Sequence, residues 1–194
     1  IKPGFDLARA AAEIYERDPA VAGLILDKHG IFTFAETAKE AYDRMIDFVT
    51  MAEKHIAEHG KSAPKSVALP TRVPAAHAIA PILRGAVAIP KGEGRFDRMI
   101  SDFRASPSIL EFLSRPRLAE LARAGVPTPD LSIRIKTGPM VLPALDADAP
   151  NEITPIIARS VADFASAYEK YFQSNDVRAE VRRPILYPMP RLTL

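Results

Sequence analysis

Cysteine is absent from the 194 residues of this chain. Disulfide bonds and thiolate metal ligands are therefore excluded, and the composition fits a reducing compartment such as the cytoplasm. No run approaches the ~20 consecutive apolar residues of a membrane helix, and no signal peptide is visible. We expect a cytoplasmic protein with no membrane partner.

The chain has no large excess of positive or negative charge, because it contains 26 Lys and Arg residues and 24 Asp and Glu residues. The basic residues are dispersed and no aromatic-rich basic strand accompanies them, so we expect no nucleic-acid partner. Hydrophobic residues make up 47% of the chain, which is enough for a sizeable core in one domain or slightly more. The first residue is Ile1 rather than Met. This start suggests a fragment, a processed form or an expressed piece of a longer protein.

Proline divides the chain into two parts. There are 18 prolines against 9 glycines, yet the first 60 residues contain only Pro3 and Pro19. We predict a boundary near Gly60 between compact alternating elements over residues 1–60 and an α/β connecting region over residues 61–194, where prolines separate the elements.

The first part predicts the order helix, hairpin, helix. An apolar face in FDLARAAAEIYER predicts a helix that Pro19 ends. Residues 21–34 predict two short strands around a turn at Asp27 to Gly30. Residues 35–60 predict a long helix that begins with a capping box at Thr33 and Glu36, or with Glu36 itself, and stops at Gly60. Its expected buried stripe consists of Tyr42, Met45, Ile46, Val49, Ala52 and Ile56.

The second part gives fewer clear elements. Residues 98–103 predict a strand, and alternation over Leu131, Ile133 and Ile135 predicts a half-buried strand. Residues 154–175 predict an amphipathic helix, whose core stripe is Ile157, Val161, Phe164, Ala165, Tyr168 and Phe172. Residues 182–194 predict an extended tail that enters a following domain or lies on a neighbour.

His29 is the strongest candidate for chemistry. It lies in the predicted turn between two strands, where a neutral imidazole on a rigid backbone suits metal ligation or proton transfer. A turn histidine that only contacts solvent is the alternative interpretation.

The stretch LILDKHGIFTFAETAKEAYDRMIDFV, residues 24–49, resembles the second half of a class II aldolase/adducin-type domain. An apolar strand there runs into an HG turn, and a second strand leads to a helix. The resemblance implies a partial three-layer α/β/α sandwich with a largely antiparallel sheet and an α/β extension. It assigns His29 as the third imidazole ligand of a divalent metal, usually zinc. The other two histidines of the family come from an earlier H-x-H, and no H-x-H occurs in this chain.

The remaining residues resemble the connecting region of bifunctional rhamnulose-1-phosphate aldolase/lactaldehyde dehydrogenases. The most specific piece is SRPRLAELARAGVPTPDLSIRIK, residues 114–136, although Leu131 stands where the family often has histidine. The resemblance implies metal-dependent retro-aldol cleavage of a ketose 1-phosphate, and an NAD-dependent short-chain dehydrogenase beyond Leu194. No G-x-G-x-x-G occurs, and KGEGRF at 91–96 has the wrong spacing. We expect a sugar-phosphate substrate, a homo-oligomer, and no activity in the isolated chain, to which no catalytic residue is assigned.

Several other readings stay open. A non-catalytic, adducin-like structural or oligomerisation module is the alternative function. HIAEH at 55–59 matches the inverted zinc-protease motif, but histidines in the last helical turn also suit the negative end of the helix dipole. We expect His77 to be a core or boundary residue rather than a ligand, and the arginines from Arg95 to Arg123 to form a solvated helical face rather than a phosphate contact.

Overall fold

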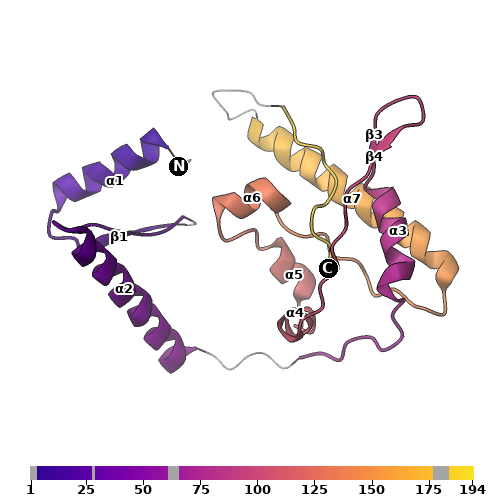
Figure 1. Cartoon of the computed structure of the whole chain (residues 1–194), viewed down its shortest axis with the longest axis horizontal. Helices are drawn as coiled ribbons and strands as arrows, with labels where there is room; N and C mark the ends of the chain where they lie inside the picture. The colour runs from indigo at the N-terminus through magenta and orange to yellow at the C-terminus, as the bar shows by residue number, and fades with distance from the viewer. Residues whose placement is uncertain (1–3, 28, 61–65, 177–183) are drawn as a thin grey trace. The chain divides into compact units, whose positions relative to one another are not determined.

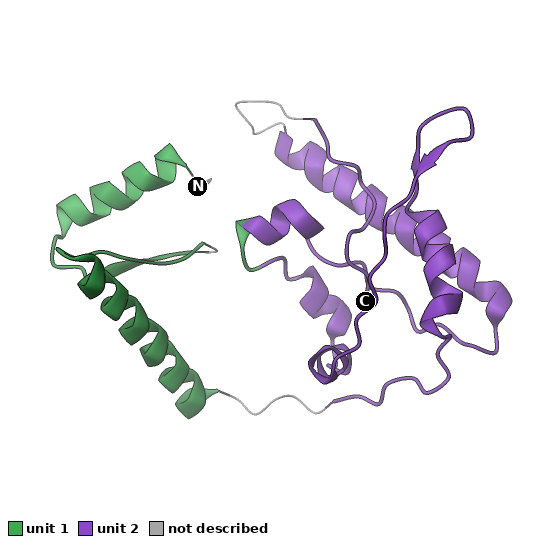
Figure 2. Ribbon diagram, viewed as in Figure 1, with its two compact units in different colours: residues 1–63, 127–129 green, residues 64–126, 130–194 purple. Residues whose placement is uncertain are grey.

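We describe a computed structural model of the chain, which covers residues 4–27, 29–60, 66–176 and 184–194 (Figure 1). The chain divides into two compact units (Figure 2). Unit 1 comprises residues 1–63 with 127–129, and unit 2 comprises residues 64–126 with 130–194. Helices dominate, and the described residues form two small antiparallel sheets of two strands each.

Unit 1 has the predicted order helix, hairpin, helix. Its elements are α1 (Phe5–Arg17), β1 (Gly23–Leu26), β2 (Gly30–Thr33) and α2 (Ala38–His59). The two strands pair in register from Gly23 opposite Thr33 to Leu26 opposite Gly30. Helix α1 ends at Arg17, two residues before Pro19, as the proline predicts.

Aromatic and polar contacts attach both helices of unit 1 to the hairpin. The ring of Tyr15 on α1 meets that of Phe34 edge to face, with centroids 5.0 Å apart. The Thr33 hydroxyl donates to the Ala41 carbonyl at 2.8 Å, and the Arg44 guanidinium donates to the Phe34 carbonyl at 2.7 Å. The hairpin thus has a fixed place between α1 and α2.

Of the two predicted starts of α2, the capping box at Thr33 was wrong by one turn, whereas Glu36 lies one residue before the observed N-cap, Thr37. Thr33 belongs to β2 and lies four residues before the first residue that caps the helix, so it is not the cap. The capping box is formed by Thr37 and Glu40 instead, with the Thr37 side chain accepting from the Glu40 amide. Gly60 follows the helix end, as predicted.

The predicted buried stripe of α2 is largely exposed. Tyr42 and Ile56 are each 66% exposed, and Ile46 is 46% exposed. No described residue of unit 1 is buried, since a two-stranded hairpin and α1 offer too little surface to cover a 22-residue helix. The periodicity of the stripe is present, but no described residue of this unit covers its outer side.

Unit 2 is built mainly from helices. Its elements are α3 (Ala76–Ala86), β3 (Ile89–Pro90), β4 (Phe96–Asp97), α4 (Pro107–Leu113), α5 (Leu118–Arg123), α6 (Pro129–Ile135) and α7 (Pro150–Asp176). Strands β3 and β4 form a short antiparallel hairpin. Among the residues that the structure describes, no helix is long and apolar enough to cross a membrane.

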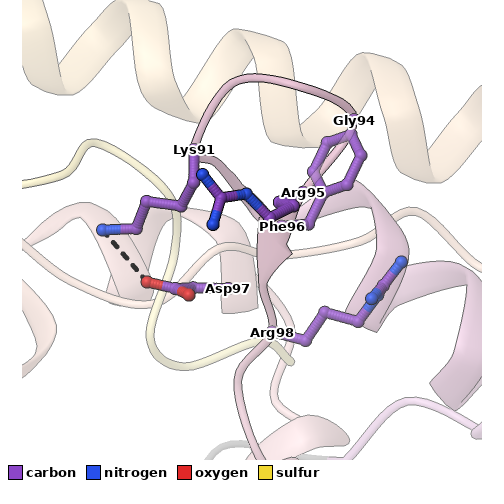
Figure 3. A pocket seen from close by; sticks show the side chains of 6 residues that line it. All are labelled: Lys91, Gly94, Arg95, Phe96, Asp97 and Arg98. Carbon is purple, nitrogen blue, oxygen red and sulfur yellow. Dashed lines mark ion pairs between the residues drawn. The ribbon is translucent and has the colours of Figure 1, made fainter.

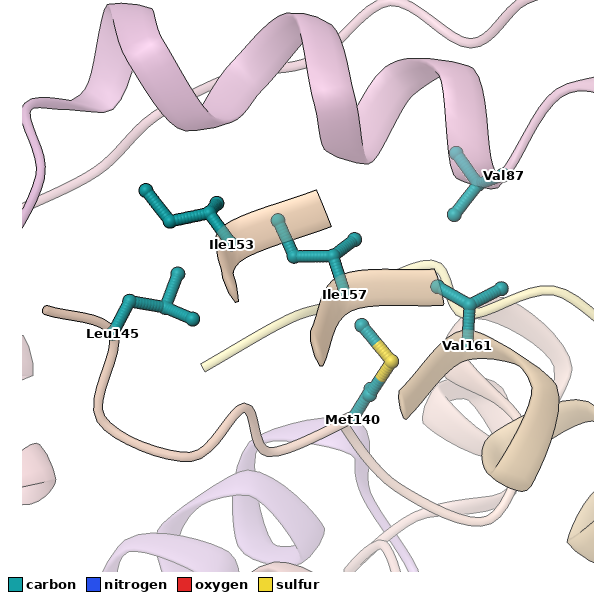
Figure 4. Packing of buried hydrophobic residues seen from close by; sticks show 6 residues of the cluster. All are labelled: Val87, Met140, Leu145, Ile153, Ile157 and Val161. Atoms are coloured by element: carbon teal, nitrogen blue, oxygen red, sulfur yellow. The ribbon is translucent and has the colours of Figure 1, made fainter. Parts of the chain in front are cut away.

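The core of unit 2 is centred on α7. Its buried residues are Ile153, Ile157, Val161, Ala165 and Tyr168. Four of them were predicted; Phe164 and Phe172 of the predicted stripe are half-buried, and Ile153 lies before the predicted start of the helix. Ile157 is completely buried and packs in one cluster with Val87, Met140 and Leu145 (Figure 4). Helix α3 lies against α7 and adds half-buried aliphatic side chains to the same cluster.

Two predicted strands are absent. Residues 98–106 form no regular structure, and β4 stops at Asp97. Residues 131–135 lie in α6, because Pro129 provides a favourable first helical residue and Asp130 forms an i,i+4 ion pair with Arg134 at 2.8 Å.

The described part of the predicted tail, residues 184–194, folds back on its own unit. Met140 and Thr193 form a parallel bridge, and the Leu194 amide donates to the Met140 carbonyl at 2.8 Å. The Tyr187 hydroxyl also donates to the Ala88 carbonyl at 2.9 Å. The described residues of the tail therefore pack on unit 2; residues 182 and 183 lie outside the described part.

We predict that Ile157→Ala destabilises unit 2 by about 2–5 kcal/mol, because it removes the most deeply buried aliphatic side chain and leaves a cavity. Urea titration followed by circular dichroism and by the tyrosine signals of α7 measures the loss. Ile133→Ala is the control, since Ile133 is 73% exposed and the change should stay within ~0.5 kcal/mol. Equal effects of the two substitutions would contradict this description of the core.

Candidate functional site

His29 lies in the turn between β1 and β2, as the sequence predicts. Its backbone amide donates to the Leu26 carbonyl at 2.9 Å, which closes the turn, and its side chain is half-buried. Gly30 follows with φ of 127°, a conformation that side chains disfavour, and a Cβ there would meet no atom within 4 Å. The glycine is therefore needed for backbone conformation rather than for space. Lys28, the neighbour of His29 in the KHGIF motif, lies outside the described residues.

The turn is held by the packing of the hairpin on α2. A Cβ placed on Gly23 of β1 would lie 2.8 Å from the Phe48 ring, so glycine permits the close approach of the strand and the helix. The half-buried imidazole of His29 is thus carried by a hairpin whose two strands are fixed against a helix. This arrangement suits a ligand or proton-transfer group whose position must be kept.

The other three histidines lie on exposed helical surfaces. His55 and His59 lie in the last turns of α2, exposed, with their rings stacked at 4.4 Å, and His77 is exposed on α3. The expectation that His77 is a core or boundary residue was wrong, because it lies on the outer face of its helix. Among the described residues, no group of three or more histidine, aspartate or glutamate side chains could hold a metal ion. The described residues therefore do not form a complete metal site. His29 could supply one ligand of such a site.

The HIAEH motif has the geometry of a helix end. The two imidazole planes are 19° apart and stacked, so their nitrogens do not converge on a common point. The His59 Nδ1 lies 3.1 Å from the His55 carbonyl, which belongs to the same turn. This geometry favours the helix-dipole interpretation of the motif.

Most arginines between Arg95 and Arg123 form exposed local ion pairs, as the prediction of a solvated face expects. The pairs join Arg95 with Glu93, Arg104 with Asp102, Arg115 with Glu111 and Arg117 with Glu120. The hydrogen bond from Arg117 lowers the pKa of Glu120. Such exposed pairs contribute little to stability. Helices α4 and α5 occupy the expected ILEFL and LAEL stretches.

The KGEGRF segment forms the tip of the β3–β4 hairpin. Gly92, Glu93 and Gly94 all have positive φ, and the Lys91 ammonium pairs with Asp97 at 3.0 Å (Figure 3). An open pocket is lined by Lys91, Gly94, Arg95, Phe96, Asp97 and Arg98. A second strand, not a helix, follows the loop, so the segment lacks the strand–loop–helix geometry of a dinucleotide site.

Lys136 is a feature that the sequence reasoning missed. Its side chain is 5% exposed, its Nζ donates to the Met189 carbonyl at 2.7 Å, and the same ammonium lies 5.4 Å from the centroid of the Tyr168 ring. Burial, and to a lesser extent the positive charge of Arg191, lowers the pKa of Lys136 to about 8. The sequence gives little indication that Lys136 is buried, since it shows only one charged residue between the apolar Ile135 and the turn residues that follow.

Comparison with known proteins identifies the class. Residues 74–194 match the family described as "Aldolase class II, second domain", and residues 2–56 match "Class II Aldolase and Adducin N-terminal domain". The first match covers more than half of the chain, so the chain belongs to the class II aldolase family. Class II aldolases generally depend on a divalent metal.

The chain is also similar to a protein of Bacillus subtilis (strain 168) named "Uncharacterized oxidoreductase YuxG". The two are 25% identical over 183 residues, which is 90% of this chain and 26% of that protein. The chain thus spans about a quarter of the length of this relative. No solved structure matches the chain.

We predict that the free energy of unfolding rises with pH between about pH 8 and pH 10.5 through Lys136. In the folded chain Lys136 loses its proton at a lower pH than in the unfolded chain, so the unfolded state binds more protons in this window. Lys136→Met should remove this rise and change stability at pH 7 by less than about 1 kcal/mol, because loss of a hydrogen bond offsets loss of a buried charge.

Chemical denaturation at several pH values measures this difference. Lys170→Met is the matched control, since Lys170 is exposed on the same helix that carries Tyr168, and it should keep the wild-type rise. A rise that persists unchanged in Lys136→Met would contradict the assignment.

Proposed function

We propose that this chain is part of a longer bifunctional enzyme of carbohydrate metabolism. Its aldolase activity cleaves a ketose 1-phosphate of the rhamnulose 1-phosphate type by a metal-dependent retro-aldol reaction. Membership of the class II aldolase family supports the reaction class. The sugar follows from the resemblance of residues 114–136 to the connecting region of rhamnulose-1-phosphate aldolase/dehydrogenases.

His29 is the residue of this chain to which we assign a role in that reaction. Its half-buried imidazole, in a turn closed by a backbone hydrogen bond and fixed by Gly30, is the observation that carries the proposal. A neutral imidazole nitrogen is a preferred ligand of zinc. His29 would supply one of three imidazole ligands, and residues outside this chain would supply the others. A divalent metal bound there would stabilise negative charge that develops on substrate oxygens.

The proposal includes an NAD-dependent lactaldehyde or alcohol dehydrogenase in the same polypeptide. The name of the Bacillus relative and its much greater length support this part. The β3–β4 loop does not have dinucleotide-binding geometry, so NAD would bind to other residues of the longer protein. Its site would therefore be independent of His29.

Unit 1 would be the C-terminal half of a three-layer α/β/α aldolase domain, corresponding to residues 1–60. The exposed outer stripe of α2 and the absence of buried residues among the described part of this unit support the proposal, because apolar faces of this kind need a covering layer. We further propose that the whole enzyme is a cytoplasmic homo-oligomer.

A non-catalytic, adducin-like assembly module is the second candidate. The family description that matches residues 2–56 names adducin beside class II aldolase, which supports this candidate. The two candidates differ in what they require of the longer protein, since only the enzyme needs further ligands for the metal.

We predict that His29→Ala, made in the full-length protein, lowers metal affinity by more than about 100-fold and reduces aldol cleavage in parallel. Stability should change by less than about 0.5 kcal/mol, because the side chain is only half-buried in a turn. Metal content after dialysis, cleavage of a ketose 1-phosphate and thermal unfolding measure the three quantities.

His77→Ala is the matched control, since it removes an exposed histidine from a helix and should leave metal content unchanged. Dehydrogenase activity should survive in both variants. Wild-type metal content and turnover in His29→Ala would refute the ligand assignment. A wild-type protein that binds no divalent metal and cleaves no sugar phosphate would support the assembly module instead.

A further inference from the structure

Unit 2 contains arginines that have no acidic partner among its described residues. The arginines of this unit that form ion pairs are Arg72, Arg95, Arg104, Arg115, Arg117, Arg134 and Arg159. Arg84, Arg98, Arg123 and Arg191 form none within the part of the chain that the structure describes. All four are exposed, so most of their N–H groups face water.

Two of these four arginines contact Met99, and a third, Arg98, is its neighbour in the chain. The Arg84 Nε donates to the Met99 carbonyl at 2.9 Å, and an Arg191 Nη lies 3.6 Å from the Met99 sulfur. Arg98 is the chain neighbour of Met99, and its guanidinium lies 5.7 Å from the centroid of the Phe96 ring. These contacts bring together residues that are up to 107 positions apart in the chain, from Arg84 to Arg191.

Among the residues that the structure describes, each guanidinium is held by a neutral group and not by a carboxylate. A carbonyl oxygen, a thioether sulfur and an aromatic ring orient the three side chains and leave their charges uncompensated. In Figure 3, Arg98 extends to the side of the hairpin away from the Lys91–Asp97 ion pair. The buried ammonium of Lys136 adds to the positive field, since it binds the Met189 carbonyl two residues before Arg191.

An open depression of the surface lies beside Arg84. A shallow pocket of about 370 Å³ is lined by Ala80, Pro81, Arg84, Ile100 and Ser101. It offers a guanidinium and a hydroxyl as donors beside apolar side chains, and Ile100 is 96% exposed.

We propose that Arg84, Arg98 and Arg191 form a binding site for a phosphate dianion carried by a small phosphorylated metabolite, with Ser101 as a further donor. Guanidinium groups bind phosphate oxygens through paired, charge-assisted hydrogen bonds. This site lies wholly in unit 2 and does not depend on the proposed metal ligand His29. Loss of one site would therefore leave the other intact.

Calorimetric and NMR titrations of the full chain test the site, with inorganic phosphate, a ketose 1-phosphate and the unphosphorylated ketose as probes. We expect both phosphates to bind, the ketose 1-phosphate more tightly, with amide shifts at residues 84, 98–101 and 191. The unphosphorylated ketose should not bind. Affinity should fall between pH 7.5 and pH 5, because a phosphate monoester loses its second negative charge near pH 6.

Two variants and one matched control sharpen the test. The double substitution Arg84→Gln with Arg191→Gln should weaken phosphate binding by about 10-fold or more, because it removes two charge-assisted interactions. Ser101→Asp should also abolish binding, since it supplies a carboxylate to the arginines without removing a contact that holds Met99. Arg123→Gln removes an equally exposed arginine without an ion pair, on α5, and should change the affinity by less than about twofold.

Several outcomes would overturn the proposal. One is the absence of phosphate binding to a folded wild-type chain, and another is equal weakening by Arg123→Gln, which would indicate a general charge effect. Binding to vesicles of anionic lipid without binding to soluble phosphates would assign the arginines to a membrane surface instead. If the double arginine variant does not fold, Ser101→Asp still decides, because phosphate binding that survives this substitution contradicts the site.

Discussion

The burial of one face of α7 is the constraint on which unit 2 depends. Ile153, Ile157 and Val161 repeat at intervals of four residues and pack with residues from α3, from the segment around Met140 and from the loop at Leu145. The tail reaches this core through backbone hydrogen bonds with Met140 and through the Lys136 ammonium. The arginines around Met99 depend on the same packing, because Arg84 lies on α3 and Arg191 lies in the tail.

Unit 1, unlike unit 2, has no buried core, since none of its described residues is buried. Local interactions define its elements: a capping box starts α2, and aromatic contacts attach α1 to the hairpin. The apolar face of α2 is largely exposed to solvent. This exposure is the physical reason for proposing that the unit belongs to a larger aldolase domain, in which another layer covers the helix. His29 is compatible with that view, because a single well-positioned imidazole becomes useful only when other ligands are supplied.

The features that could be predicted from the sequence are those that depend on interactions between residues close together in the chain. The hairpin around His29 and the helices α1, α2 and α7 follow from local periodicity, turn residues and prolines. The alternation of Leu131, Ile133 and Ile135 was misleading, because the Asp130–Arg134 pair and Pro129 favour a helix over the same residues. Burial of the α2 stripe required a partner that periodicity cannot supply. The contacts of Lys136 with Met189 and of Arg84 and Arg191 with Met99 join distant segments, so no local pattern indicates them.

The central claim is that the turn of the first hairpin carries a metal ligand of a class II aldolase. Anomalous diffraction at the zinc edge from crystals of the full-length protein tests it most directly. The account predicts a metal peak about 2.0–2.1 Å from an imidazole nitrogen of His29, with further ligands from outside this chain. A bound metal elsewhere in the protein, with the His29 imidazole making no contact to it, would contradict the claim.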